Sequence, residues 1–430
     1  MQADILIVGA GAAGLMAARE LSHAGRHVVV LEARDRVGGR AYTFSDAGFS
    51  GPTEAGAEFI HGEASLTRAL LQAVGGTYQA TAGHTYELRQ GRLQSSELFT
   101  EHMPQLLAQL HALPHDMPLA DFLTQYFPAA HQQPLRELAT QFAEGYDAAD
   151  AHRASTFALR DEWSTGGAED SPRPVGGYGP LLEALARQGQ AAGVLLQLNT
   201  AVQALHWQPG RVEALCSEGR RYSARQALLT VPLGVWQTTP NEPGHMRLVP
   251  ELPTHRAAVA ALGFGSVIKI LLEFDESFWE ADTLRNPMPE LEFLLSDAAV
   301  PTWWSQLPDQ RPLLTGWLAG PAAHRLRSTP DDVVLAQALT SLSYLFGLPV
   351  ATLQQRLRAH RVINWGADPL ARGAYTYATV DDAAARRTLT TPVEDTLFFA
   401  GEGLYTGPAM GTVEAALASG QHQARQMLQV

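Results

Sequence analysis

The first forty residues constrain the fold more than any other part of the chain. A short apolar run at 5–8 precedes Gly9, Gly11 and Gly14 in G-x-G-x-x-G spacing, and an Ala- and Leu-rich segment follows. A second apolar run, at 28–31, ends at Glu32. This order predicts a strand, a tight turn, a helix and a second strand within about 30 residues, which is the pattern of a dinucleotide-binding unit.

Each residue of this pattern has a physical role. Gly9 allows a tight exit from the strand, Gly11 leaves room for a pyrophosphate beside the backbone, and Gly14 lets the helix pack closely on the strand. The free N–H groups of the first helical turn favour phosphate. Glu32 can accept hydrogen bonds from both ribose hydroxyls of an adenosine and would repel a 2′-phosphate. We therefore expect a dinucleotide other than NADP; a glycine-rich turn in another α/β unit is the alternative.

Composition limits the class of protein. The chain has 430 residues, of which 46% are apolar and 17% charged, so it is long enough for two globular domains. A net charge of −13 argues against nucleic-acid binding and is compatible with cationic ligands. A single cysteine, Cys216, excludes an internal disulfide and a Cys-rich zinc site, and we predict no metal. No apolar run could span a bilayer and no targeting segment is convincing, so we expect a cytoplasmic protein with no membrane contact.

The basic residues are nearly all arginine. Lys and Arg total 31, and Lys269 is the one lysine among them. A single lysine marks a position where the forked guanidinium of arginine does not serve, because the ammonium is compact. The β-branched content of residues 263–274 predicts a strand around it, in which the ammonium would be partly buried and in need of a partner. An edge-strand lysine that faces solvent is the alternative.

The residues after Glu32 carry a family resemblance. Residues 32–40 resemble the E-A-x-x-R-x-G-G-R signature of the flavin-containing amine oxidase (monoamine oxidase) family. In that family the glycine pair and the last arginine, here Arg40, run beside the pyrophosphate of FAD and toward the flavin. Residues 54–62 resemble a segment of polyamine and spermine oxidases, with Phe59 where Trp is usual. The resemblance implies that this segment runs along the flavin and that His61 faces the substrate. A solvated basic loop and a histidine that caps a turn are the alternatives.

Later motifs follow the family in order. Val202 matches a residue whose backbone contacts the adenine, although a plain core position explains it equally. Lys269 matches a lysine that holds a water against the flavin N5. Trp365 opens a motif that leads to Tyr375, one of an aromatic pair that flanks the amine. Ala374 stands where members with covalent flavin carry Cys, so the resemblance implies noncovalent FAD.

The C-terminal motifs complete the resemblance. Residues 398–402 resemble F-A-G-E, whose carboxylate, here Glu402, bonds the ribityl or pyrophosphate side of FAD. Residues 411–416 resemble G-T-V-x-G-A at the start of the last helix, whose positive end would face the flavin N1–C2=O edge. Thr412 stands where monoamine oxidases and some polyamine oxidases have the second aromatic residue of the pair. Spermine-oxidase-like and histone-demethylase-like members of the family have Thr at this position.

The resemblance assigns three overlapping sets of site residues. The catalytic set is Lys269, His61 and Tyr375. The cofactor set is Gly9, Gly11, Gly14, Glu32, Arg34, Arg40, Gly56, Ala57, Val202, Trp365, Gly401, Glu402, Thr412 and Val413. The substrate set is Phe59, His61, Trp317, Tyr375 and Thr412. For Trp317, a core position is an equal alternative.

The implied fold is α/β with two domains. A Rossmann-like FAD-binding domain would comprise residues 1–80, 175–245 and 388–430. An α+β substrate domain, with a mixed sheet flanked by helices, would comprise 81–174 and 246–387. Locally, the pattern predicts helices over 65–135, with breaks at Gly75–Gly76, Pro114, Pro118 and Pro128 and a turn near Gly91. It also predicts a helix from 136 to about Ala151.

The implied reaction is FAD-dependent oxidation of an amine to an imine, with O2 reduced to H2O2. Amino-acid oxidases of this superfamily hold the substrate carboxylate with an arginine, where this chain has the acidic residues Glu54 and Glu58. This favours a polyamine or another primary or secondary amine, bound by a monomer or homodimer. The alternatives are an L-amino-acid oxidase, a desaturase or protoporphyrinogen-oxidase-like enzyme, and an FAD-binding protein without turnover.

Overall fold

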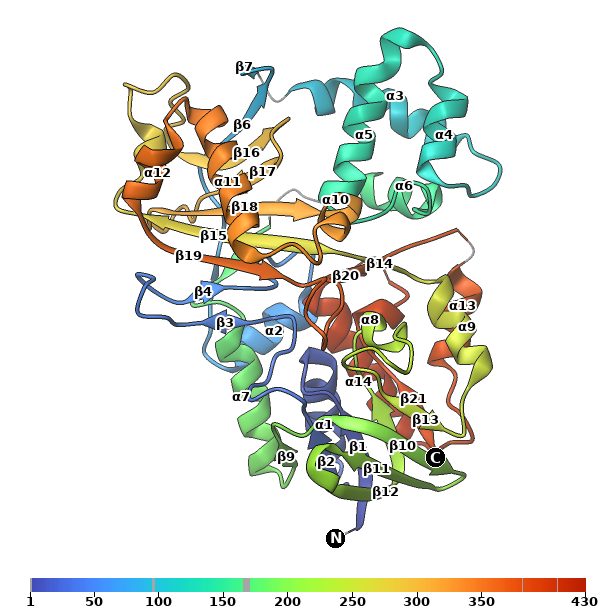
Figure 1. Cartoon of the computed structure of the whole chain (residues 1–430). Helices are drawn as coiled ribbons and strands as arrows, with labels where there is room; N and C mark the ends of the chain where they lie inside the picture. Colours follow the sequence, from blue (N-terminus) through green and yellow to red (C-terminus); the bar gives the residue numbers. More distant parts are fainter. Residues whose placement is uncertain (1, 95–96, 165–170, 381, 408) are drawn as a thin grey trace.

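A computed structural model of the chain describes residues 2–94, 97–164, 171–380, 382–407 and 409–430. The lower part of the molecule in Figure 1 is built on an eight-stranded sheet, in the order β13-β10-β11-β12-β1-β2-β9, with β21 also paired to β12. Its strands are β1 (Gln2–Val8), β2 (Val28–Leu31), β9 (Leu195–Gln197), β10 (Val202–Gln208), β11 (Arg211–Cys216), β12 (Arg221–Leu229), β13 (Arg247–Val249) and β21 (Leu397–Phe399).

The predicted strand–helix–strand unit is confirmed. β1 and β2 pair in parallel, and α1 (Ala12–His23) connects them. The apolar face of α1 packs with α7 (Gly179–Ala191) and α14 (Val413–Met427) over one face of the sheet. Because β1 and β2 are parallel and in register, Gly9 and Glu32 lie side by side where the two strands end.

A second sheet forms the upper left of the molecule in Figure 1. Its order is β19-β15-β18-β17-β16-β6-β7, in which β16 and β6 run parallel and the other described pairs are antiparallel. The strands are β6 (His84–Arg89), β7 (Arg92–Gln94), β15 (Val267–Phe274), β16 (Leu291–Ser296), β17 (Thr302–Trp304), β18 (Leu313–Ala319) and β19 (Leu357–Asn364). Helices α10 (Gly320–Arg325), α11 (Asp331–Phe346) and α12 (Val350–Arg356) cover one face. The predicted mixed, helix-flanked sheet is therefore present.

Strand β15 decides the position of the single lysine. All eight of its residues are buried, so both faces of the strand are covered. Ile268, Ile270 and Leu272 face the core that α10–α12 form. Side chains alternate along a strand, so Lys269 points from the opposite face, toward the part of the chain that carries the glycine-rich turn.

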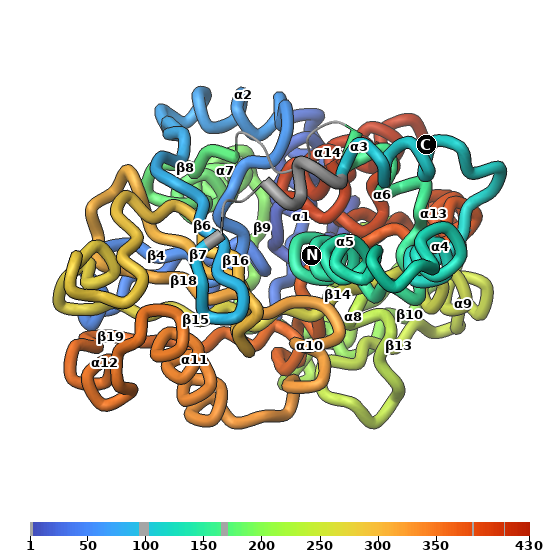
Figure 2. The backbone as a smooth tube through the Cα atoms, turned by 90° about the horizontal axis from the view of Figure 1, so that it is seen from above, coloured from blue at the N-terminus to red at the C-terminus, as the bar shows by residue number. Residues whose placement is uncertain are grey.

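Four helices form a third group, with its own apolar core, at the upper right of Figure 1. They are α3 (Glu97–His111), α4 (Leu119–Tyr126), α5 (Gln133–Gly145) and α6 (Thr156–Ser164). Figure 2 shows from above that this group and the second sheet stand beside each other.

Two local predictions were wrong. The expected run of helices over 65–135 is interrupted at 84–94, where β6 and β7 form a hairpin that joins the second sheet through β16. Tertiary pairing overrides local preference there. The expected helix from 136 to Ala151 ends at Gly145, and Ala148 has a left-handed backbone with φ of 50°. This break places Asp147 in a loop.

The strands of the two sheets follow the predicted segments except β13, which lies just beyond residue 245 and joins the first sheet. The domain boundaries themselves stay a prediction. Over the described ranges, no single helix is long and apolar enough to cross a membrane, and α11 with α12 reaches that length only as a pair bent by 110°. In the same ranges, no group of three or more His, Cys, Asp or Glu side chains could hold a metal ion.

Candidate active site

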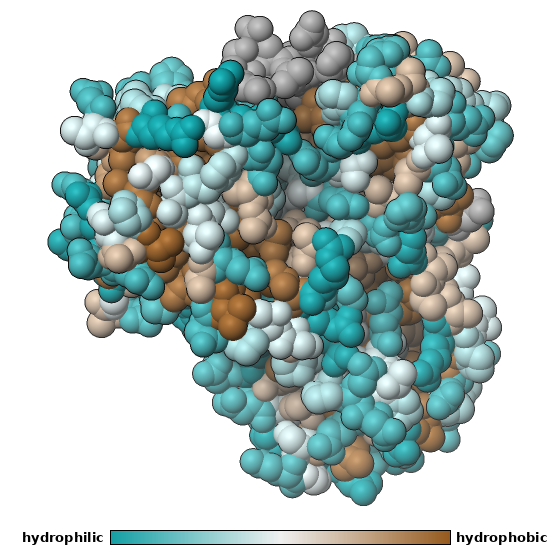
Figure 3. Space-filling model, turned by 45° about the horizontal axis from the view of Figure 1, so that its top comes forward, coloured by the Kyte–Doolittle hydropathy of each residue, from teal (hydrophilic) through white to brown (hydrophobic). Residues whose placement is uncertain are grey.

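A cavity of about 3070 Å³ extends from the carboxyl ends of β1 and β2 to the second sheet. Figure 3 shows the molecule hollowed between its two upper parts. All the predicted site residues except Gly14 line this cavity. The structure therefore brings together residues that were predicted from motifs spread over the whole chain.

The glycine-rich end of the cavity fits a dinucleotide. Gly9 has φ of +109°, and a Cβ on Gly14 would lie 2.0 Å from the Gly9 carbonyl oxygen, so Gly14 serves the packing of α1 on β1. A Cβ on Gly11 would meet no atom within 4 Å, because Gly11 faces open space. Gly401 is likewise open, with φ of +148°. Pyrophosphate can thus approach the backbone where the motif predicts it.

Glu32 closes this end of the cavity. One of its carboxylate oxygens accepts from the Ala10 N–H at 2.7 Å and the other from the Arg34 N–H at 2.9 Å. Each carboxylate oxygen has a second lone pair, so both ribose hydroxyls of an adenosine could still donate to Glu32. The same carboxylate fixes the glycine-rich turn and offers a site for the ribose.

Two arginines beside the cavity are held by acidic partners. Arg40 pairs with Glu402 at 2.7 Å, and the same carboxylate accepts from the Thr376 hydroxyl at 3.2 Å. Arg34 pairs with Asp368 at 2.9 Å. Glu402 thus positions Arg40 in the structure, while its predicted direct contact with FAD stays a prediction.

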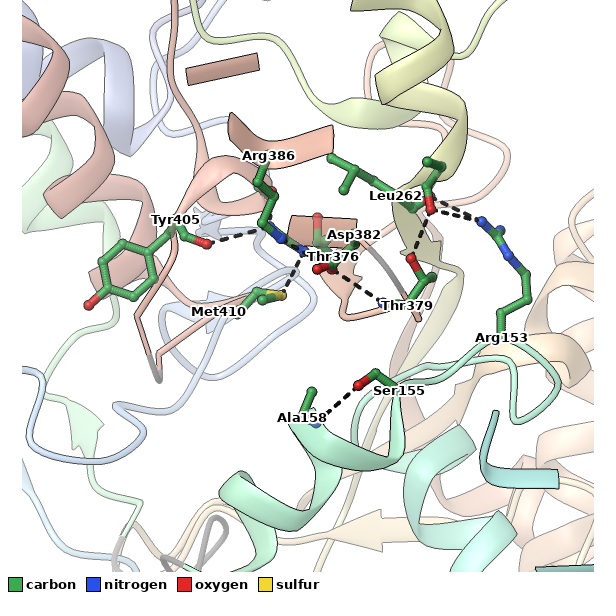
Figure 4. Close-up of polar contacts among 12 residues, drawn as sticks. Arg153, Ser155, Ala158, Leu262, Thr376, Thr379, Asp382, Arg386, Tyr405 and Met410 are labelled. Atoms are coloured by element: carbon green, nitrogen blue, oxygen red, sulfur yellow. Dashed lines mark hydrogen bonds and ion pairs between the residues drawn. The ribbon is translucent and has the colours of Figure 1, made fainter. Parts of the chain in front are cut away.

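The approach to α14 is fixed by side chains shown in Figure 4. Arg386 of α13 (Asp382–Thr390) pairs with Asp382 at 2.9 Å and donates to Met410 Sδ at 3.1 Å and to the Tyr405 carbonyl at 3.4 Å. Thr412 then caps α14, accepting from the Ala415 N–H at 3.2 Å. The positive end of α14 is therefore held at the cavity wall, where Thr412 and Val413 line it.

Lys269 lies in a buried polar cluster. Its ammonium donates to Glu58 Oε2 at 2.7 Å and to the Gly56 carbonyl at 3.1 Å. Glu58 Oε1 accepts from Arg173 at 2.8 Å and from the Trp304 indole at 3.0 Å. Burial alone would raise the pKa of Glu58, but Lys269 and Arg173 outweigh it and lower that pKa to about 2. The solvent-facing alternative for Lys269 is wrong.

Aromatic side chains line the opposite end, which we call the amine end. Trp317 stacks on Tyr375 with ring centroids 6.5 Å apart and lies 5.6 Å from Trp304. Phe59 contacts Trp304 at 5.6 Å and the His61 ring at 6.0 Å. Trp317 is therefore a cavity residue as well as a packed one. Thr412 leaves the facing wall without an aromatic ring at its position.

His61 and Tyr375 are neutral at neutral pH. Burial lowers the pKa of His61 to about 4, and its Nδ1 lies 3.0 Å from the Ser171 hydroxyl and 3.2 Å from the Tyr146 hydroxyl. Burial raises the pKa of Tyr375 well above its ordinary value, and its hydroxyl donates to the Tyr146 carbonyl. A cationic substrate would therefore meet no like charge from His61.

An acidic pair at the amine end was missed by the sequence analysis. Asp147, from the break after α5, and Glu162, from α6, both line the cavity. Burial raises the pKa of Asp147 well above its ordinary value, and the Glu162 charge and hydrogen bond raise it further. Burial raises the pKa of Glu162 too, with the hydrogen bond from Asp147 opposing it. Ionisation of one carboxyl group therefore disfavours ionisation of the other, and the shift is stronger at Asp147 than at Glu162.

Glu162 is positioned by the start of its helix. Ser155 precedes α6 and accepts from the Ala158 N–H at 3.1 Å, as Figure 4 shows. The motif-free stretch around Asp147 and Glu162 gave no local signal, because the two residues meet only through tertiary structure.

The acidic residues that the sequence singled out have other partners. Glu54 accepts from the Thr43 hydroxyl at 2.7 Å and from the Tyr178 N–H, and burial raises its pKa to about 7. Glu58 is engaged by Lys269 and Arg173. Neither is a solvated surface acid, and neither is placed to hold a second ammonium.

Comparison with known proteins identifies the family. The family model for flavin containing amine oxidoreductases matches residues 12–428. Polyamine oxidase 4 of Oryza sativa subsp. japonica is 30% identical over 97% of this chain and 87% of its own length. Lysine-specific histone demethylase 2 of Homo sapiens is 27% identical over 93% of this chain and 50% of its own length. The chain therefore belongs to the flavin-containing amine oxidoreductase family, and it is an enzyme of that class with FAD as its cofactor.

Solved structures confirm the fold. A putrescine oxidase bound to putrescine superposes with a TM-score of 0.81 at 21% identity, with all of both chains covered. Cyclohexylamine oxidase from Brevibacterium oxydans IH-35A gives the same TM-score and identity, over 100% of this chain and 99% of its own. The predicted amine-oxidase fold is thus confirmed.

Proposed function

We propose that the chain oxidises a polyamine, or another primary or secondary amine that carries a second positive charge, to an imine and passes the electrons to O2 to form H2O2. The observation that carries this proposal is the acidic pair at the amine end. Asp147 and Glu162 offer negative charge at a part of the cavity wall where His61 and Tyr375 are neutral.

The cofactor supplies the redox chemistry, because FAD accepts the two electrons that leave the amine carbon. The chain's own residues bind and orient the amine. Trp317 and Tyr375 would flank the alkyl chain, and Glu162 would hold the distant ammonium by a charge-assisted hydrogen bond. Lys269 offers an N–H donor to the cavity between the glycine-rich end and the amine end.

The electrostatics of the cavity favour this reading over amino-acid oxidation. Lys269 and Arg173, which contact the Trp304 and Phe59 rings, are both paired with Glu58 and so are less available to a substrate carboxylate. A carboxylate would also be repelled by Glu162. An FAD-binding protein without turnover would not need a buried lysine at the cavity wall.

Anaerobic mixing of the purified yellow protein with a panel of amines tests the proposal. The signal is the flavin absorption band at about 450 nm. We expect rapid bleaching by spermine, spermidine or a diamine, and H2O2 on admission of O2. Bleaching only by a small aromatic amine would contradict the polyamine assignment. No bleaching by any amine would contradict the proposed function altogether.

A further inference from the structure

Glu58 stands out among the buried charged groups, because the proposed chemistry assigns it no direct role. It lies in the loop between β4 (Thr53–Glu54) and α2 (Ser65–Ala73), and it directly precedes Phe59 of the amine end. Its exposed fraction is 7%, that of Arg173 is 8%, and that of Lys269 is 0%. Three full charges are thus removed from water at one place.

The geometry of this cluster limits what the lysine can do. An ammonium has three N–H donors. Glu58 Oε2 takes one at 2.7 Å and the Gly56 carbonyl takes another at 3.1 Å. Since Lys269 lines the cavity, the third donor is the one left for a ligand there.

The carboxylate that fixes the lysine is itself fixed. Arg173 donates to Glu58 Oε1 at 2.8 Å and to the Ser305 carbonyl at 3.0 Å, so the guanidinium ties the loop to the end of β17. The Trp304 indole donates to the same Oε1 at 3.0 Å. With these donors on Oε1, Oε2 is left facing Lys269.

We propose that Glu58 is a positioning residue for Lys269: its carboxylate, together with the Gly56 carbonyl, directs the one remaining N–H donor of the lysine into the cavity. Arg173 and the Trp304 indole hold that carboxylate in place. Because Glu58 precedes Phe59, the same contact ties the amine end to the lysine. The inference rests on the proposed function, since the lysine affects turnover only if the chain oxidises amines.

The single lysine makes this proposal directly measurable. Selective labelling of the holoenzyme with 15N-lysine yields one side-chain nitrogen signal, whose chemical shift reports the contacts of the Lys269 nitrogen. Glu54, Glu58 and Arg173 are the charged groups that surround this nitrogen from the elements packed around β15.

Glu58→Gln keeps the size of the side chain and removes its charge. We expect the 15N signal of Lys269 to move in this variant, because the acceptor at 2.7 Å loses its charge. Glu273→Gln is the matched control, because Glu273 is a buried glutamate too but lies on β15 and pairs with Arg311 at 3.0 Å. It should leave the signal where the wild type has it.

An unchanged 15N signal in folded Glu58→Gln would overturn the proposal. If Glu58→Gln does not fold, Glu58→Asp keeps the charge with a shorter reach, and a smaller shift of the signal is expected. No shift in that variant would count against the proposal. Since the signal needs no turnover, bleaching by amines without a shift would refute this inference alone. A shift without bleaching would refute the proposed function alone.

Discussion

The two ends of the cavity are built in different ways. At the glycine-rich end, the site is formed mainly by the backbone. Gly9 has a positive φ, Gly11 faces open space, and Glu32 accepts hydrogen bonds from two backbone N–H groups. At the amine end, side chains from distant segments meet, such as Asp147 after α5 and Glu162 on α6. The cofactor site is thus fixed mainly by local sequence, and the substrate site by tertiary structure.

The largest expected effect lies between the two ends, at Lys269. Lys269→Met removes a buried charge-assisted hydrogen bond at 2.7 Å and leaves Glu58 with Arg173 as its remaining charged partner, so the free energy of unfolding should fall by about 3 kcal/mol, the upper end for a hydrogen bond to a charged group. Chemical denaturation of the purified variant measures this.

Arg356→Met is the control for that experiment. Arg356 pairs with Glu276 at 2.6 Å, but their side chains are 33% and 67% exposed. An exposed pair should cost less than about 1 kcal/mol. Equal losses in the two variants would show that Lys269 and Glu58 are not a buried pair.

At the glycine-rich end, Gly11→Ala and Gly14→Ala separate binding from folding. The new Cβ of Gly11→Ala enters open space, so the apoprotein should melt like the wild type while its Kd for FAD rises about 10- to 100-fold, or about 1.4–2.8 kcal/mol. Gly14→Ala should also destabilise the apoprotein, because its Cβ would meet the Gly9 carbonyl at 2.0 Å. Titration with FAD and thermal unfolding report the two effects. If Gly11→Ala bound FAD with wild-type affinity, the role assigned to Gly11 in FAD binding would be wrong.

At the amine end, the effect of pH sharpens the comparison. The pKa of Glu162 is raised. As pH falls, Glu162 therefore loses its charge before an ordinary glutamate would, at a pH above about 4.3. The KM of a diamine relative to that of a monoamine should therefore rise as pH falls through this region. His61, with a pKa of about 4, stays neutral over most of it. A KM ratio that is constant with pH would contradict the role of the pair.

The smallest expected effect concerns the cap of α14. Thr412→Val removes the oxygen that accepts from the Ala415 N–H and should lower the free energy of unfolding by about 1 kcal/mol. Thr388→Val, on the exposed side of α13, is a control that removes no cap. Urea denaturation compares the two, and equal stability of both variants would show that the cap contributes nothing.

The sequence alone predicted most of the cofactor end. The spacing of Gly9, Gly11 and Gly14 and the position of Glu32 follow from the geometry of one strand–helix–strand unit. Lys269 was also informative, because two observations pointed to a buried lysine with a specific role: it is the one lysine of the chain, and it lies in an apolar strand. The partner Glu58 was seen only as an acidic residue, since its pairing depends on how β15 faces the loop after β4.

The amine end shows what local sequence leaves out. The pattern predicted a helix through Ala151, but the chain turns at Ala148 and so places Asp147 beside Glu162. The hairpin of β6 and β7 was likewise missed, because its pairing partner β16 lies some 200 residues away. Contacts between residues far apart in the chain leave no periodic pattern in the sequence from which they could be predicted.

The most direct test of the account compares Glu162→Gln with Asp147→Asn. In anaerobic mixing, the concentration of a diamine that bleaches the flavin at half the maximal rate should rise at least about 10-fold in Glu162→Gln, as expected for the loss of a charge-assisted hydrogen bond. Asp147→Asn should stay close to the wild type, because an asparagine amide can donate to Glu162 as the protonated Asp147 does. A monoamine of the same chain length should respond to neither change. Equal half-saturating concentrations of the diamine in the wild type and Glu162→Gln would contradict the claim that this end of the cavity binds a second positive charge.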